Sequence, residues 1–401
     1  LVVCNQDLIG DYVKTYIGNL DQEVFPDSAI VNCHRHEMDM RTTYGDEIII
    51  ASPGCLCENH IVRTVKQIDF SDGRQVKASY PDGYVKYRRM QKMYEFWQQG
   101  AIIVHVVKGE KPSVIPCRIK KVGEEYAMSY FDKIYTNSGV YEPERKTIIN
   151  GDIHIPNCDG AVLSVTENIA ADYKADTYVN LGDVNNSSAL NHHIMNKGNS
   201  VGDEDVLREI SIVHYILKKL SDLAPDCRLV QGNHERFYRD FVEKYPQLKN
   251  LVDFVFLAGV EKLGYKHEDV HGVIDVDGMI YFHGDMIMYG QKGNRSEKAS
   301  KNFGSQCMMG HIHYPSIRFG CYSIGMSGSL DQKYNEINAS RWTHGIGLCN
   351  HYKGENFATT IPISNYHLFI NGKSYLPSES ISEWQDFPEF KAVLDFEFEE
   401  S

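Results

Sequence analysis

Residues 147–156 read TIINGDIHIP, and this stretch contains the pattern that decides the fold. A short β-branched run, TII, ends in a turn that carries glycine, aspartate and histidine. Four later segments repeat the arrangement: VNLGDVNN (179–186), VQGNHER (230–236), YFHGD (281–285) and MMGHIH (308–313). The apolar runs at 147–149, 178–181 and 228–230 predict buried strands, so each polar turn should follow the end of a strand.

A helical pattern lies between two of these strand-and-turn segments. Residues 204–220, EDVLREISIVHYILKKL, place apolar side chains at helical spacing: Val206, Ile210, Val213, Ile216, Leu217 and Leu220. Strands that alternate with helices predict an α/β sheet. Ligands of such sheets bind beyond the strand ends, where the five turns are expected.

The residue types in the turns suit one kind of chemistry. Aspartate, asparagine and histidine offer oxygen and imidazole donors, and this mixture suits Mn²⁺, Fe²⁺ or Zn²⁺ better than Ca²⁺. One Asp-x-His or Gly-Asp is weak support for a metal site, because polar turn residues are common. Five such turns in order, each after a strand-like run, predict a metal centre.

The order D-x-H, G-D, G-N-H-E, H and G-H-x-H resembles the calcineurin-like metallophosphoesterase superfamily over residues 145–376. The resemblance implies two packed mixed β-sheets flanked by helices. It also implies two divalent metal ions, with Mn²⁺ favoured over Mg²⁺, Fe²⁺ or Zn²⁺, bridged by an aspartate and by water or hydroxide. That hydroxide would attack a phosphoester in line with the leaving oxygen.

The resemblance also assigns roles to residues of this chain. Asp152, His154 and His313 would bind the first metal, Asp183 would bridge, and Asn233, His283 and His311 would complete the second metal site. His234 would act on the phosphate as general acid or electrostatic stabiliser, so His234, Asp183 and Asn233 are the expected catalytic residues.

Two positions depart from the protein Ser/Thr phosphatase pattern. Asn186 stands where many superfamily members have an acidic residue or histidine, three residues after the bridging aspartate. Gln231 replaces the arginine that precedes G-N-H-E in those phosphatases. Both differences weaken a protein-phosphatase interpretation.

Three residues near the turns are candidate substrate contacts. His192 and His193 follow the bridging aspartate by about ten positions and would reach the phosphate, or else lie on an exposed helix. Arg236 would bind phosphate, or else pair with a neighbouring carboxylate such as Glu235.

The first part of the chain resembles the last part in collinear order. LVVCNQD (1–7) parallels MIYFHGD (279–285), NCHRH (32–36) parallels MGHIH (309–313), ASPGCL (51–56) parallels GMSGSL (325–330), and FWQQG (96–100) parallels RWTHG (341–345). The pattern predicts an internal duplication. Residues 1–143 would be a partial, degenerate copy with an insertion at 57–96, and residues 144–401 the catalytic domain.

The copy has lost residues that a metal site needs. Cys4 takes the place of His283 and Cys33 the place of Gly310, so CHRH is interpreted as a remnant. The alternative is that an upstream segment completes this copy and that His34 and His36 still bind a ligand.

The insertion is rich in lysine, arginine and tyrosine, including Arg88 and Arg89. Basic side chains interleaved with aromatic ones suit phosphate contacts and base stacking. The alternative is a solvated loop whose PDG is only a turn.

Composition sets outer limits. The net charge of −13 argues against general electrostatic coating of nucleic acid, although a nuclease with bound metals and a local basic patch remains compatible. A transmembrane run and a secretory signal are not recognised, and ten scattered cysteines suit a reducing compartment. We expect a cytoplasmic protein, in the host cytoplasm if it is phage-encoded, that has DNA as substrate and no membrane partner. A homo-oligomer is compatible with the sequence, and the oligomeric state is left open.

Three functions compete. The favoured one is a metal-dependent nuclease, most similar to the SbcD-type branch and its bacteriophage relatives, including pre-early nucleases that degrade host DNA. Whether it would be an exonuclease or an endonuclease is left open. The second is a phosphomonoesterase or protein phosphatase of the same fold. The third is a non-enzymatic metal-binding scaffold, which intact ligands in all five turns argue against.

Overall fold

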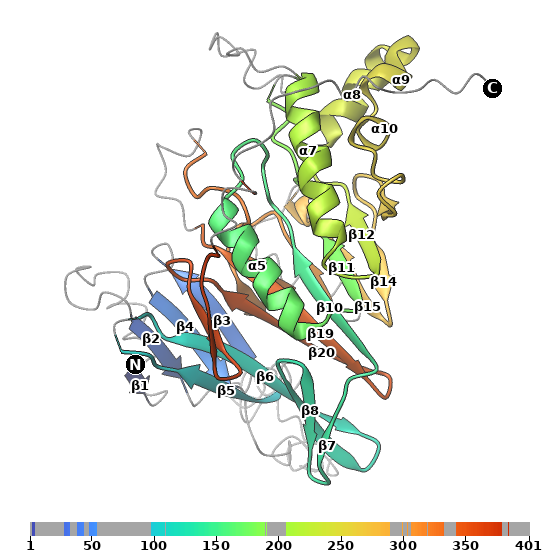
Figure 1. Ribbon diagram of the computed structural model, residues 1–401. Helices are drawn as coiled ribbons and strands as arrows, with labels where there is room; N and C mark the ends of the chain where they lie inside the picture. The colour runs from blue at the N-terminus through green and yellow to red at the C-terminus, as the bar shows by residue number, and fades with distance from the viewer. Residues whose placement is uncertain are drawn as a thin grey trace, which may run out of the picture.

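The structure is a computed structural model. It describes residues 2–4, 28–32, 38–43, 48–53, 98–108, 110–188, 190, 206–288, 299, 303, 306–318, 320–332, 342–378 and 384. Within these ranges it is a mixed α/β fold in which two mixed sheets pack on one another and on helices (Figure 1).

A six-stranded sheet contains the three strands that the sequence predicts most directly. Its order is β13 (Lys266–Glu268), β12 (Asp226–Val230), β11 (Thr177–Asn180), β10 (Arg145–Asn150), β19 (Gly345–Tyr352) and β20 (Glu355–Pro362). The strands predicted at 147–149, 178–181 and 228–230 are confirmed as β10, β11 and β12, which are parallel to one another. Helices α5 (Gly160–Tyr173) and α7 (Val206–Ser221) run along this sheet, and α7 confirms the predicted helix (Figure 1).

Alternation along these strands divides the interior into two apolar layers, because successive strand residues face opposite sides of a sheet. Ile148, Tyr178 and Leu229 lie in one core cluster with Val213, Ile216 and Leu217 of α7. Their neighbours Ile149, Val179 and Val230 lie in a second cluster with residues of another sheet, including Tyr281, Met308 and Ile317. The six-stranded sheet is therefore covered by helices on one face and by a sheet on the other.

That second sheet has nine strands. Its order is β1 (Val2–Cys4), β2 (Ser28–Asn32), β4 (Ile48–Pro53), β3 (Met38–Thr43), β17 (Ser316–Arg318), β18 (Cys321–Ser323), β16 (Cys307–Met309), β15 (Met279–Phe282) and β14 (Ile274–Val276). Strands from the two ends of the chain meet at the antiparallel pair of β3 and β17. Outward from this pair, β4, β2 and β1 mirror β18, β16 and β15 in order and in direction.

Strand pairing in the nine-stranded sheet agrees with one of the sequence matches between the two ends of the chain and corrects another. Ile317 pairs with Met40, and these residues are 277 positions apart, the same separation as MGHIH and NCHRH. In the adjoining hairpins, Met40 pairs with Ala51 and Ile317 with Tyr322, so Ala51 corresponds to Tyr322. The parallel of ASPGCL with GMSGSL is therefore wrong by three residues, because the hairpin of β3 and β4 has more strand pairs beyond Met40 than the hairpin of β17 and β18 has beyond Ile317.

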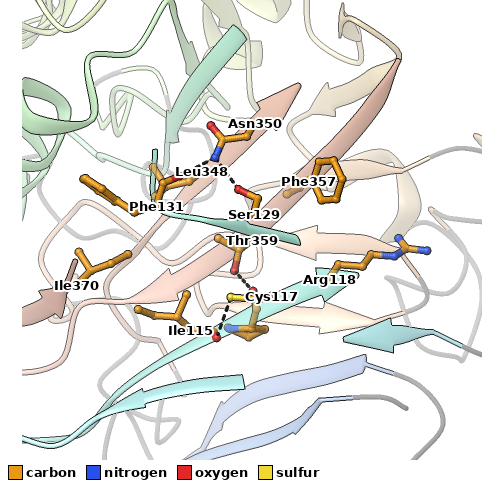
Figure 2. Close-up of a pocket in the computed structure, with 12 residues that line it drawn as sticks. Ile115, Cys117, Arg118, Ser129, Phe131, Leu348, Asn350, Phe357, Thr359 and Ile370 are labelled. Carbon is orange, nitrogen blue, oxygen red and sulfur yellow. Dashed lines mark hydrogen bonds between the residues drawn. The ribbon is translucent and has the colours of Figure 1, made fainter. Parts of the chain in front are cut away.

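A five-stranded antiparallel sheet contacts both the six-stranded and the nine-stranded sheet. Its strands are β5 (Gln99–His105), β6 (Ser113–Val122), β7 (Glu125–Tyr130), β8 (Lys133–Thr136) and β9 (Val140–Tyr141). Figure 2 shows part of its contact with β19 and β20: the Thr359 hydroxyl donates to the Pro116 carbonyl of β6 at 2.9 Å, and the Asn350 amide donates to Ser129 Oγ of β7 at 2.6 Å. The cavity left there, about 10 Å³, has room for little more than one water molecule. This junction is closely packed.

The remaining elements are short. They are α8 (Arg236–Lys244), η2 (Pro246–Leu248), α9 (Lys249–Val252), α10 (Phe254–Ala258), η3 (Asp285–Met288), β21 (Leu368–Ile370) and β22 (Lys373–Tyr375). Among the helices in the described residues, none has the length and apolar character needed to cross a membrane. The cysteines with described surroundings are all free thiols: Cys117, Cys158, Cys227, Cys307, Cys321 and Cys349.

Candidate metal centre

All five polar turns lie at the carboxyl ends of strands. The first three follow β10, β11 and β12, and the last two follow β15 and β16 of the nine-stranded sheet. Parallel neighbours end at the same edge, so β10, β11 and β12 bring their turns together, and β15 and β16 do the same. The packing of the two sheets then brings both groups of turns to one place.

Two clusters of potential ligands form at this place. One consists of Asp152, His154, Asp183 and His313, and the other of Asp183, His283 and His311. Within each cluster the ligand atoms lie within 4.8 Å of one another. Asp183 belongs to both clusters, as a bridging ligand would.

The first cluster is closely spaced and buried. His313 Nε2 is 3.3 Å from His154 Nε2 and 3.3 Å from Asp152 Oδ1. His154 Nε2 is 3.9 Å from Asp183 Oδ2. Nitrogen and carboxylate oxygen donors thus converge from three different turns.

The second cluster surrounds one imidazole nitrogen. His283 Nε2 is 3.3 Å from Asp183 Oδ2 and 3.1 Å from His311 Nδ1. Asn233 Oδ1 lies 3.0 Å from the same nitrogen. Asn233 therefore lies beside the residues of this cluster.

The outer nitrogens of two histidines fix which inner nitrogens carry lone pairs. His283 Nδ1 lies 2.8 Å from the Leu181 carbonyl, and His154 Nδ1 lies 3.2 Å from Asn186 Oδ1. Because these oxygens accept hydrogen bonds, in the neutral imidazoles each Nδ1 carries the proton and each Nε2 directs its lone pair into its cluster. Lone pairs that converge beside carboxylates fit a divalent cation.

Asn186 stands three residues after Asp183, where the sequence comparison leads one to expect an acidic residue or histidine. Its side-chain oxygen orients His154, and its backbone carbonyl lies 2.9 Å from His234 Nδ1. The loss of the acidic side chain therefore does not remove a hydrogen-bond acceptor behind His154.

Electrostatics at the centre of the site are dominated by Asp183. Burial would raise the pKa of Asp183, but the imidazoles of His283 and His234 hold it well below its usual value. Burial would lower the pKa of His283, but the Asp183 carboxylate raises it to about 10. Burial, together with the neighbouring imidazoles of His234 and His313, lowers the pKa of His154 to about 3. Without a metal, Asp183 is thus paired with a proton on His283, which a cation at this position would displace.

The backbone of these turns is in an uncommon conformation. Positive φ angles occur at Asp152 (51°), His154 (54°), Asp183 (48°), His311 (67°) and His313 (59°). Such angles are costly for residues other than glycine and persist where the surroundings hold them. Their concentration at the ligand positions indicates a preorganised site.

Two glycines allow the turns to approach one another. A Cβ atom on Gly232 would lie 2.2 Å from Asp183 Oδ1, and one on Gly310 would lie 2.8 Å from Asp152 Oδ2. Any side chain at either position would displace a carboxylate of the site. The glycines in G-N-H-E and G-H-x-H are therefore required by space.

Glu235 holds the Asp183 turn, a role that sequence reasoning missed. Its carboxylate is fully buried and accepts hydrogen bonds from the backbone N–H groups of Gly232 (2.7 Å), Asp183 (3.0 Å), Val184 (2.8 Å) and Asn185 (3.2 Å). The final glutamate of G-N-H-E was the available signal, because an acidic residue beside a metal-binding turn needs donors when it is buried.

His234 faces the site from its edge. Its Nε2 is 3.9 Å from Asp183 Oδ2, and its backbone N–H donates to Asp183 Oδ1 at 2.9 Å. Its side chain is 14% exposed, whereas that of Asp183 is 2% exposed. His234 is thus more accessible to a substrate than Asp183 is.

The predicted substrate contacts are resolved only in part. Arg236 Nε lies 3.4 Å from Asp240 on the next turn of α8, which matches the carboxylate-pairing alternative. His192, His193, Arg88 and Arg89 lie outside the described residues, as do Cys33, His34 and His36.

Residues 145–321, less than half of the chain, match the family model of calcineurin-like phosphoesterases. This range includes every residue of both clusters, so the match covers the whole candidate site. The match and the Asp/His clusters support a metal-dependent phosphoesterase that uses divalent metal ions. No curated protein matches the chain. A solved structure of a Vps29 single mutant from Entamoeba histolytica is similar at 14% identity and a TM-score of 0.32, over 57% of this chain and 95% of that chain.

Proposed function

We propose that the chain is a two-metal-dependent phosphodiesterase that hydrolyses nucleic acid, with DNA as the favoured substrate and Mn²⁺ as the favoured metal. The observation that carries the proposal is the pair of clusters that share Asp183. Within the superfamily, we place it with the SbcD-type nucleases and their bacteriophage relatives on the G-N-H-E motif and the basic insertion.

Each residue of the site has a separate role in this proposal. Asp152, His154 and His313 would hold one cation, Asn233, His283 and His311 the other, and Asp183 both. Bound divalent cations would supply Lewis acidity and an activated water. His234 would contact the phosphate: its Nδ1 donates to the Asn186 carbonyl, so in the imidazolium form its Nε2–H would donate a proton or hydrogen bond to a phosphate or leaving-group oxygen.

Two features favour nucleic acid over a phosphoprotein. Asn186 and Gln231 occupy positions where protein phosphatases carry other residues, and Gln231 is buried rather than presented to a substrate. The segment 71–96 combines basic and aromatic side chains, which suits phosphate contacts and base stacking. Arg88 and Arg89 of this segment, with His192 and His193, remain predicted DNA contacts.

The test compares substrates and one variant. Linear DNA, covalently closed circular DNA and a simple phosphomonoester are each incubated with the protein in Mn²⁺, in Mg²⁺ or in EDTA. His234→Ala should lower the cleavage rate by about 10²–10⁴-fold, the range usual for loss of a general acid. His267→Ala is the matched control, because His267 is on β13 and pairs with Glu261 rather than with the clusters.

The outcomes separate the candidate activities. Metal-dependent cutting of the closed circle, lost in His234→Ala and retained in His267→Ala, supports an endonuclease. Cutting of linear DNA alone supports an exonuclease. Hydrolysis of the phosphomonoester with both DNA forms intact overturns the nuclease proposal and supports a phosphatase.

A further inference from the structure

A hydrogen bond joins the N-terminal strands to the segment behind the first cluster. Thr42 of β3 and Thr343 have their hydroxyl oxygens 2.9 Å apart, and the two residues are 4% and 0% exposed. They are 301 positions apart in the chain. A buried hydroxyl pair of this kind is specific, because removing either hydroxyl leaves the other without that partner.

Backbone hydrogen bonds connect Thr343 directly to His313 and, through residues 326–328, to Asp152. Its N–H donates to the His313 carbonyl at 2.9 Å, and its carbonyl accepts from Met326 N–H at 2.9 Å. Gly328, two residues after Met326, donates its N–H to the Asp152 carbonyl at 2.9 Å. Thr343 therefore links the turn that carries His313 to the turn that carries Asp152.

Both turns need such support. Asp152 and His313 adopt φ angles of 51° and 59°, which are unfavourable unless the surroundings hold them. The chain leaves His313 for β17, where Ser316 pairs with Arg41, one residue before Thr42. The ring of Trp342, next to Thr343, packs edge-on against His313 with centroids 4.4 Å apart. The N-terminal strand thus reaches the His313 turn both through the sheet and through Thr42.

We propose that Thr42 and Thr343 are positioning residues, by which the N-terminal strands hold His313 and Asp152 in the geometry of the first metal site. This inference rests on the proposed metal centre. It gives residues of the N-terminal segment a part in metal binding although they contribute no ligand. The hydroxyl pair acts through the Thr343 backbone and touches neither substrate nor metal.

The direct test measures Mn²⁺ binding to the whole chain by calorimetry, beside the free energy of unfolding of the metal-free protein. Thr42→Val and Thr343→Val remove the hydroxyls and keep the shape of the side chain. Loss of a group that orients ligands from behind usually lowers metal affinity by about 10–100-fold. We expect a loss in this range for the Mn²⁺ ion held with Asp152 and His313 and a smaller change for the other ion, because the second cluster takes His283 and Asn233 from turns that Thr343 does not contact.

Further variants separate positioning from general damage to the fold. Thr42→Ser should restore the affinity, because it restores the hydroxyl. The double variant should lose no more than either single variant, because both remove the same interaction. Thr166→Val is the matched control: Thr166 is also fully buried, but its hydroxyl donates to the Val162 carbonyl within α5.

Each result has one meaning. Wild-type protein that binds no Mn²⁺ overturns the proposed function and this inference with it. Two bound ions in the wild type, with unchanged affinities in Thr42→Val, overturn the inference alone. An equal loss at both sites, or an equal loss in Thr166→Val, shows a general effect on the fold and also overturns it.

Discussion

At the scale of single residues, the site depends on buried polar side chains that hydrogen bonds hold in one orientation. Asp183 is shared by both clusters, and Glu235 binds four backbone N–H groups around it. The motif letters predicted which residues gather in the two clusters, because Asp and His at strand ends have few other uses in such number. The motif letters did not predict Glu235 as a support, because its partners are backbone groups from two turns that meet only in the folded chain.

Glu235→Gln should weaken the site without removing a ligand. The amide keeps one acceptor, but its NH₂ group would face backbone donors, so at least one N–H group would lose its partner. Each buried donor left unpaired costs about 1–3 kcal/mol. We expect the free energy of unfolding, measured by urea titration, to fall by that amount, and Mn²⁺ affinity to fall with it. Unchanged affinity and stability would show that Glu235 does not hold the Asp183 turn.

Asn186→Ala tests the orientation of His154. The variant removes the oxygen 3.2 Å from His154 Nδ1 but keeps the backbone carbonyl that binds His234. Affinity for one Mn²⁺ should fall by about 10-fold or more, as is usual when the outer partner of a histidine ligand is lost. Calorimetry that finds both ions bound as tightly as in the wild type would contradict this role.

At the scale of elements, strands and helices were predicted correctly where the apolar residues follow a clear pattern along the sequence. The runs before the first three turns are β10, β11 and β12, and the amphipathic pattern at 204–220 is α7. The meeting of β3 with β17 was not predicted, because pairing between distant strands leaves no local pattern. The turns themselves were predicted as polar, but their positive φ angles depend on contacts between turns.

The G-N-H-E turn gives a prediction about space. Gly232→Ala would place a Cβ atom 2.2 Å from Asp183 Oδ1, so the bridging carboxylate would have to move. Both Mn²⁺ ions should bind at least about 10-fold more weakly, since outer-shell changes alone have effects of this size. Gly139→Ala is the matched control, because its Cβ would meet only Tyr141 at 3.7 Å. Equal affinities in the two variants would show that this close approach is not required.

Helix α7 gives a prediction about packing. Ile216 is fully buried against the six-stranded sheet, and Leu207 on the same helix is 40% exposed. Ile216→Ala should lower the free energy of unfolding by about 2–5 kcal/mol because it leaves a cavity. Leu207→Ala should change it by no more than about 0.5 kcal/mol. Similar losses in both variants would contradict the placement of the buried face.

At the scale of the whole molecule, the nine-stranded sheet supports the proposal of an internal duplication. Strands β1, β2, β4 and β3 mirror β15, β16, β18 and β17 across the β3–β17 pair. We therefore continue to propose that residues 1–143 are a partial second copy and residues 144–401 the catalytic domain. The insertion at 57–96 lies outside the described residues, so its proposed contact with DNA rests on composition.

The measurement that tests the central claim most directly is the number of Mn²⁺ ions bound per chain, in the wild type and in Asp183→Asn. Asp183 is the residue that both clusters share. We predict two ions in the wild type, and weakened binding of both in Asp183→Asn, because one carboxylate serves both sites. One ion in the wild type, or the loss of only one ion in the variant, would contradict a paired metal centre bridged by Asp183.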